Sequence, residues 1–121
     1  MKIALPVEGN SVESSVCQNF GRAPYFLIHN TLSKENEFID NAAVTTQGGA
    51  GIKAAQTIVD HQADALITPR CGENAAKVMN GANIIIYKTI NDTINENIDA
   101  FYRGKLALLQ DIHAGFHNHG K

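Results

Sequence analysis

The sequence has neither an excess of basic residues nor a long hydrophobic run. Its 121 residues include 10 Lys and Arg against 12 Asp and Glu, which gives a formal net charge of −2. Proteins that bind nucleic acids or anionic membranes usually carry a basic patch, so the sequence predicts neither kind of partner. No apolar stretch approaches the roughly 20 residues that span a bilayer, and the amino terminus enters an expected strand without the apolar core of a signal peptide. We therefore expect a cytoplasmic protein.

Cysteine is also scarce. Only Cys17 and Cys71 are present, and a reducing cytosol disfavours a disulfide between them. The chain contains no CxxC pair and no HExxH sequence. These absences argue against a zinc finger and against an ordinary iron–sulfur protein.

What the sequence does contain is the pattern of one α/β domain. Hydrophobic residues make up 44% of the chain, enough for a single core. Short apolar runs predict five strands, at residues 2–7, 25–29, 37–44, 65–68 and 84–87. Apolar residues at helical spacing predict three helices, at residues 52–61, around 75–79 and from 94 to 102. Residues 93–96 have the form of a capping box that would start the last helix.

The order of these elements, βββαβαβα, predicts a ribonuclease-H-like fold. In this three-layer α/β arrangement, about three helices cover a mixed five-stranded sheet with the first strand at its centre. We assign the domain to residues 1–106. Residues 107–121, rich in histidine, are interpreted as a flexible tail.

Three segments converge at one edge of the expected sheet. They are the polar loop at 8–22, the glycine-rich turn at 48–51 and the segment 69–72. Ligands in open α/β sheets bind outside the carboxyl ends of the strands. We therefore expect the functional site at this edge.

The two thiols are candidate ligands at that edge. Cys71 is expected at the start of the second helix, where the helix dipole and the adjacent Arg70 would stabilise a thiolate. A small buried capping residue is an equally valid interpretation of this cysteine. Cys17 lies in the polar loop, where we expect less burial. Two thiols suit a soft metal, but they do not close a metal site, so the pair fits a protein that holds a preassembled cluster.

The glycines Gly48, Gly49 and Gly51 form a second candidate feature. They would let the backbone approach an anion at the amino end of the first helix. A tight turn with close helix packing explains them equally well. The run matches neither the P-loop nor the GxGxxG fingerprint.

The histidines divide into two groups. His29 and His61 are expected at the opposite edge of the sheet, exposed to solvent or at a helix end. His113, His117 and His119 form a loose cluster in the tail. Such tracts bind transition metals, with adventitious affinity as the alternative interpretation.

Acidic residues are few at the expected site. A ribonuclease-H-type nuclease needs several carboxylates around two metal ions, but the first strand offers none before Glu8, and Asp64 precedes the fourth strand at its other end. No Ser–His–Asp or Cys–His pair is suggested either. We therefore expect a protein that is not an enzyme.

Three motifs, taken in order, resemble one family. They are IALPV at 3–7, FGRAPYF at 20–26, and GGAGI at 48–52 followed by AAQ at 54–56. The resemblance is to the dinitrogenase iron–molybdenum cofactor biosynthesis family, which includes NifX, NafY, the carboxyl-terminal domain of NifB and the orange proteins. It extends to about residue 106 and implies a ribonuclease-H-like fold and a role in binding or carrying a metal–sulfur cofactor.

One position departs from the family pattern. The family usually has histidine immediately before the FGR run, whereas this chain has Asn19. Cys17, two positions earlier, would face the same side of an extended backbone, and we hypothesise that it replaces this histidine. Arg22 would supply positive charge to an anionic cluster or pair with a nearby acid.

The sequence thus predicts an accessory protein that binds or carries a metal–sulfur cluster of molybdenum, iron or copper, with a cluster donor or acceptor protein as partner. The candidate cofactor-binding residues are Cys17, Asn19, Arg22, Gly48, Gly49, Gly51, Arg70 and Cys71, and the candidate metal ligands are Cys17, Cys71, His113, His117 and His119. The alternatives are a small-anion or nucleotide-binding regulatory module and a metal-dependent nuclease inferred from the fold alone.

Overall fold

The computed structural model describes residues 1–41, 48–110 and 112–113. Its elements are β1 (Lys2–Val7), the 3-10 helix η1 (Phe20–Arg22), β2 (Tyr25–Asn30), β3 (Asn36–Asp40), α1 (Ala50–Asp60), β4 (Ala65–Thr68), β5 (Cys71–Gly72), α2 (Glu73–Gly81), β6 (Ile85–Lys88), α3 (Ile94–Tyr102) and β7 (Ile112–His113). Within these residues, the helices are too short and too polar to cross a membrane.

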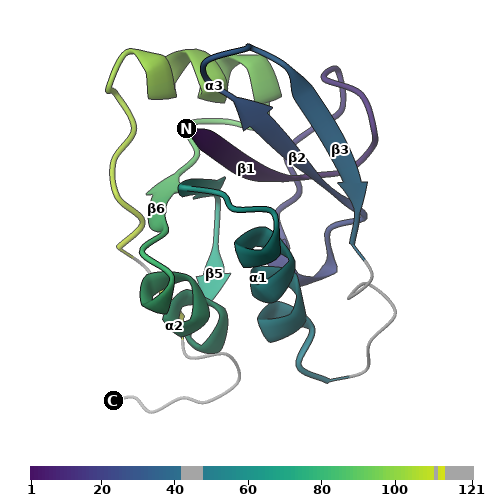
Figure 1. The fold of residues 1–121 in the computed structure, drawn as a ribbon, viewed down its shortest axis with the longest axis vertical. Coiled ribbons are helices and arrows are strands. Elements are labelled where there is room, and N and C mark those ends of the chain that lie inside the picture. The colour runs from purple at the N-terminus through teal and green to yellow at the C-terminus, as the bar shows by residue number, and fades with distance from the viewer. Residues whose placement is uncertain (42–47, 111, 114–121) are drawn as a thin grey trace.

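Five strands form a mixed sheet with β1 at its centre (Figure 1). The strand order is β3-β2-β1-β4-β6. Strands β1, β2 and β3 pair antiparallel, while β1, β4 and β6 run parallel to one another. The predicted ribonuclease-H-like topology is confirmed. A separate two-stranded sheet joins β5 to β7.

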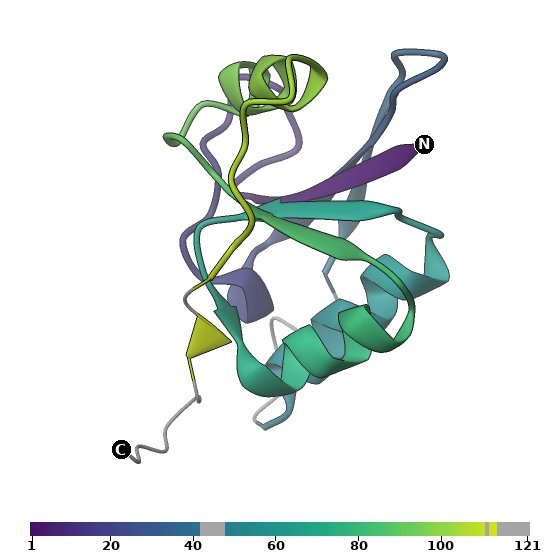
Figure 2. The same ribbon diagram turned by 90° about the vertical axis from the view of Figure 1, so that its left-hand side faces the viewer.

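The helices cover both faces of the sheet. Figure 2 shows α3 on one side and α1 with α2 on the other. Successive side chains of β1 point to opposite faces of the sheet, so this one strand contributes to the hydrophobic core on each side. Ile3, Leu5 and Val7 pack in the core under α3, whereas Ala4 packs in the core under α1 and α2.

The start of α3 differs from the predicted capping box. Thr93 is the N-cap residue, but its side chain makes no capping hydrogen bond. The fully buried Asn97 instead ties the first turn of α3 to the loop before it: its Nδ2 donates to the Thr93 carbonyl at 2.8 Å, and its Oδ1 accepts from the Ile90 amide at 2.8 Å. Glu96 instead accepts a hydrogen bond from the Asn91 side chain. These bonds hold the loop against the first turn of the helix, but none of them caps the helix amides.

Two expected boundaries also change. The third strand was expected at 37–44, but it ends at Asp40, and residues 42–44 lie outside the described ones. The folded chain also continues past the expected domain end at residue 106. Residue Leu109 is buried, and its amide donates to the Ile86 carbonyl at 2.9 Å. The edge strand β6 has backbone groups that need partners, and the segment after α3 supplies them.

Candidate functional site

The long polar loop after β1 is folded against its neighbours. Val7 bridges Val16, and the Glu8 amide donates to the Ser15 carbonyl at 2.9 Å. The loop is also tied to the segment after β6, because Gln18 Nε2 donates to Asp92 Oδ1 at 2.9 Å. These bonds hold the end of the loop at the carboxyl edge of the sheet, where η1 follows.

The helix η1 packs closely on the start of α1. A Cβ added at Gly21 would lie 3.1 Å from the Gly51 amide nitrogen and 3.2 Å from its Cα. Only a glycine at position 21 allows this approach without displacement of one backbone. The contact brings the FGR sequence beside the amino end of α1.

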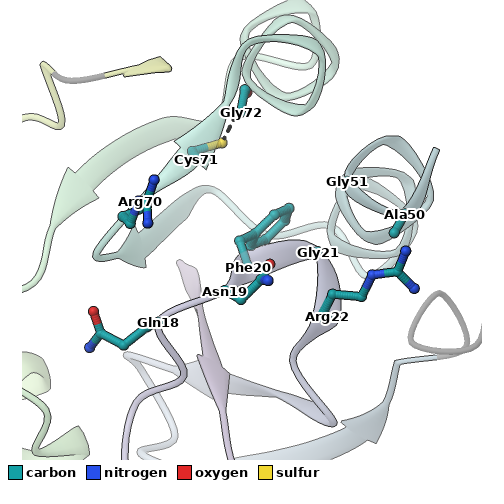
Figure 3. A pocket seen from close by; sticks show the side chains of 10 residues that line it. All are labelled: Gln18, Asn19, Phe20, Gly21, Arg22, Ala50, Gly51, Arg70, Cys71 and Gly72. Carbon is teal, nitrogen blue, oxygen red and sulfur yellow. Dashed lines mark hydrogen bonds between the residues drawn. The ribbon is translucent and has the colours of Figure 1, made fainter. Parts of the chain in front are cut away.

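A pocket of about 370 Å³ opens at this junction. Its walls come from the loop before η1, from η1, from the first turn of α1 and from the segment between β4 and α2. The lining residues are Gln18, Asn19, Phe20, Gly21, Arg22, Ala50, Gly51, Arg70, Cys71 and Gly72. In Figure 3, Arg70 and Arg22 lie on either side of Asn19 and Phe20.

The pocket is electropositive. It is lined by Arg22 and Arg70, and none of the described residues that line it is acidic. Ala50 and Gly51 begin α1, and Gly72 is the N-cap residue of α2. The amino ends of two helices therefore border the same space, where their unpaired amides and dipoles favour an anion. The arrangement suits a negatively charged guest.

Cys71 lines this pocket as a neutral thiol. Its side chain is 1% exposed, its Sγ donates to the Gly72 carbonyl at 3.5 Å, and burial raises the pKa of the thiol to about 11. The expectation of a dipole-stabilised thiolate is therefore wrong for this conformation. Cys71 precedes the N-cap residue of α2 and packs in the apolar cluster under α1 and α2, so the cost of desolvating a thiolate exceeds the benefit of the dipole.

Cys17 lies away from the pocket lining. It is 6% exposed and packs in the same apolar cluster, so the expectation of low burial in this loop is also wrong. Burial raises the pKa of its thiol, a backbone hydrogen bond with Asn19 lowers it, and the Glu8 side chain raises it. The polar loop folds back across the end of β1, with the Cys17 amide bonded to the Pro6 carbonyl, and this places the side chain in the core.

The structure brings together five of the predicted site residues. Asn19, Arg22, Gly51, Arg70 and Cys71 line the pocket. Cys17 does not line it, so its suggested replacement of a histidine at position 19 requires movement of this side chain out of the core.

Gly48 and Gly49 also lie outside the pocket lining. Gly49 is the N-cap residue of α1 with a φ of 70°, which fits the interpretation of a tight turn. The pocket wall also contains five residues that were not among the predicted site residues, namely Gln18, Phe20, Gly21, Ala50 and Gly72. The FGR sequence was the available signal for two of them.

The histidines do not converge on the pocket. His29 is 5% exposed, so the expectation that it faces solvent is wrong. Asn36 from β3 and Tyr102 from α3 bond to its two ring nitrogens, each at 2.6 Å, and cover it. His61 ends α1 with Nδ1 at 3.0 Å from the Thr57 carbonyl. The backbone of His113 belongs to β7, while His117 and His119 lie outside the described residues.

The side chains around the pocket do not form a metal-binding set within the described residues. Across the described ranges, no three His, Cys, Asp or Glu side chains are grouped so as to hold a metal ion. One neutral thiol and two guanidinium groups are a poor set of ligands for a bare cation. They fit an anionic group whose metals already have their own sulfide ligands.

Comparisons with known proteins identify the family of the chain. The family model described as dinitrogenase iron–molybdenum cofactor matches residues 1–104. An uncharacterised protein of Methanocaldococcus jannaschii is 34% identical over 109 residues, which cover 88% of this chain and 89% of that protein.

Solved structures show the same fold. The apo form of the orange protein from Desulfovibrio gigas superposes with a TM-score of 0.85 at 29% identity, covering 90% of this chain and 92% of that one. A Thermotoga protein proposed as NifB superposes with a TM-score of 0.80 at 32% identity, covering 98% of both chains.

The fold and the family match place the chain in a class of small α/β proteins associated with a metal cofactor. The chain belongs to the dinitrogenase iron–molybdenum cofactor family. This membership links it to the binding or biosynthesis of such a cofactor.

Proposed function

We propose that the protein binds a preassembled, anionic metal–sulfur cluster in the pocket between η1, α1 and α2, and carries it as an accessory protein. The cluster is the cargo. Its metal is molybdenum, iron or copper, and a second protein donates or receives it. The protein itself performs no catalytic step.

One observation carries this proposal: the pocket combines two arginines and two helix amino ends with a single neutral thiol. Guanidinium groups and backbone amides donate hydrogen bonds to anions and do not ligate metals. The metals of the guest therefore need inorganic ligands, which a sulfide cluster provides. Asn19 and Gln18 border the same space and can donate amide hydrogen bonds.

Reconstitution tests the proposal. The protein is incubated without oxygen with molybdate, iron(II) or copper(I), each with and without sulfide, then desalted and examined by absorption spectroscopy and metal analysis. We expect a retained, coloured species only when sulfide is present. The double variant Arg22→Gln/Arg70→Gln should retain much less of it. Lys105→Gln is the matched control, because Lys105 is an exposed cation outside the pocket lining.

The alternatives give different results in the same series. Retention of iron or copper without sulfide would contradict an anionic cargo, and retention of molybdate without sulfide would favour the small-anion module. Displacement of the cluster by millimolar phosphate or nucleotide would instead favour the small-anion module. Cleavage of nucleic acid in the presence of magnesium or manganese would favour a nuclease, which the absence of acids from the described pocket lining argues against.

A further inference from the structure

Asn41 is a polar residue buried behind the pocket wall. It follows β3 directly and is only 2% exposed. Its side-chain Nδ2 donates to the Ala23 carbonyl at 2.8 Å and to the Gly21 carbonyl at 3.3 Å. Its backbone amide donates to the Pro24 carbonyl at 3.1 Å. One residue at the end of β3 therefore binds the carbonyl groups of the segment that contains the end of η1.

The 3-10 helix η1 has little stability of its own. It contains three residues, and its internal hydrogen bonds are long: the Arg22 amide donates to the Asn19 carbonyl at 3.1 Å, and the Ala23 amide to the Phe20 carbonyl at 3.4 Å. A helix of one turn does not recover the entropy lost in forming it. Tertiary contacts must therefore hold η1 in place, and Asn41 supplies hydrogen bonds that do so.

Arg22 lies between the two carbonyl groups that the Asn41 side chain binds. This arginine lines the pocket, and Figure 3 shows its side chain extending from η1 toward the first turn of α1. The backbone conformation at a residue restricts the rotamers of its side chain. Because Asn41 fixes the backbone on both sides of Arg22, it also fixes the point from which the guanidinium group enters the pocket.

We propose that Asn41 is a positioning residue of the pocket, which holds η1 so that Arg22 is in place before an anion binds. The inference rests on the function proposed above. Asn41 itself lies outside the pocket lining, so its effect reaches the anion through Arg22. A charged group that is already in place loses less conformational freedom on binding. We therefore expect Asn41 to strengthen anion binding by about two- to tenfold.

Amide hydrogen exchange, measured by NMR without any anion, tests the positioning. In Asn41→Ala, the amides of Arg22 and Ala23 should exchange at least about tenfold faster than in the native protein, while the amides of the central strand β1 keep their protection. Asn97→Ala is the matched control, because Asn97 is also a buried carboxamide that donates to backbone carbonyls but lies in α3, outside the pocket lining. It should leave the exchange of Arg22 and Ala23 unchanged.

Two exchange results overturn the proposal. One is an unchanged rate at Arg22 and Ala23 in Asn41→Ala, and the other is an equal acceleration throughout β1, which would mean general destabilisation. If Asn41→Ala does not fold, Asn41→Ser, which keeps a small polar side chain, is compared in the same way.

A double-mutant cycle then tests whether Asn41 acts through Arg22. The probe is tetrathiomolybdate, a preassembled anion whose molybdenum has only sulfide ligands, and equilibrium dialysis measures its affinity. Asn41→Ala should weaken binding about two- to tenfold in the native background but cause no further loss in Arg22→Gln. Asn97→Ala should bind with native affinity.

An equal loss from Asn41→Ala in both backgrounds would overturn the proposal, because Asn41 would then not act through the arginine. Absence of binding in every protein, the native one included, would refute the proposed function. The exchange measurement needs no anion, so it decides by itself whether Asn41 positions η1.

Discussion

Gly21 of η1 and Gly51 of α1 pack backbone against backbone. The space beside Gly21 is so narrow that an added Cβ would meet the Gly51 amide nitrogen at 3.1 Å and the Ala50 carbonyl carbon at 3.4 Å. Both glycines line the pocket. Their contact therefore sets how closely the arginine of the FGR sequence approaches the amino end of the helix.

Gly21→Ala should widen this junction. The obstructing atoms are backbone, which cannot rotate away, so we expect a loss of about 1–3 kcal/mol in the free energy of unfolding, typical of overpacking. Urea unfolding measures it. Gly48→Ala is the matched control, because an added Cβ there meets nothing within 4 Å, and it should change stability by less than about 1 kcal/mol. Equal effects of the two substitutions would show that the close contact is not needed.

Arg70→Gln should weaken binding of an anionic cluster without unfolding the protein. The side chain is exposed and forms no ion pair within the described part of the chain. Because solvent screens an exposed charge, we expect a loss of affinity of about three- to tenfold rather than abolition. Titration at two salt concentrations measures it, and salt should weaken the native protein more than the variant. An affinity with the same salt dependence in both proteins would contradict the role of this charge.

The buried thiol of Cys71 predicts a loss of stability at alkaline pH. Its pKa is raised from 9.0 to about 11 in the folded protein by desolvation. The unfolded chain therefore loses this proton first as the pH rises. The stabilisation is complete below pH 9 and is lost between about pH 9 and 11, with a total of about 2–3 kcal/mol.

Urea unfolding of the native protein and Cys71→Ala over this pH range measures the difference. Titration of other groups is common to both proteins and cancels in the comparison. The stability of the native protein should fall toward that of the variant as the pH rises. A difference that stays constant from about pH 8 to 11 would show that the thiol is not desolvated in this way.

His29 connects β3 to α3 through its ring. The Asn36 Oδ1 can only accept, so His29 Nδ1 carries a proton, and in the neutral ring Nε2 accepts from the Tyr102 hydroxyl. Tyr102→Phe removes that donor and leaves a buried nitrogen without its partner, at an expected cost of about 1–3 kcal/mol. Urea unfolding gives the cost, and ¹⁵N chemical shifts of the ring identify the tautomer.

The control for this substitution is Leu32→Ala. Leu32 is 85% exposed, so its truncation should cost less than about 0.5 kcal/mol. If Tyr102→Phe costs no more than this, or if the neutral ring carries its proton on Nε2, the hydrogen-bonded chain from Asn36 to Tyr102 is not as described.

Much of the fold could be predicted because hydrophobic periodicity is a local property. The continuous apolar run at residues 3–7 predicts a buried strand, and the helices follow from apolar residues at intervals of three and four. Capping was predicted less well. The side chain that ties the start of α3 to the preceding loop is Asn97, within the helix, and its partners lie in a loop whose course no local pattern specifies.

The sequence by itself determined the order of the elements, the sheet topology and the sheet edge at which the pocket opens, because periodicity and the right-handed crossover rule constrain these features. Only the tertiary structure decided which residues meet there. Burial depends on contacts between segments distant in sequence. Only the tertiary structure therefore shows that Cys17 lies in the core and that Cys71 is a neutral thiol withdrawn from solvent. It also brings residues 112–113 beside Cys71.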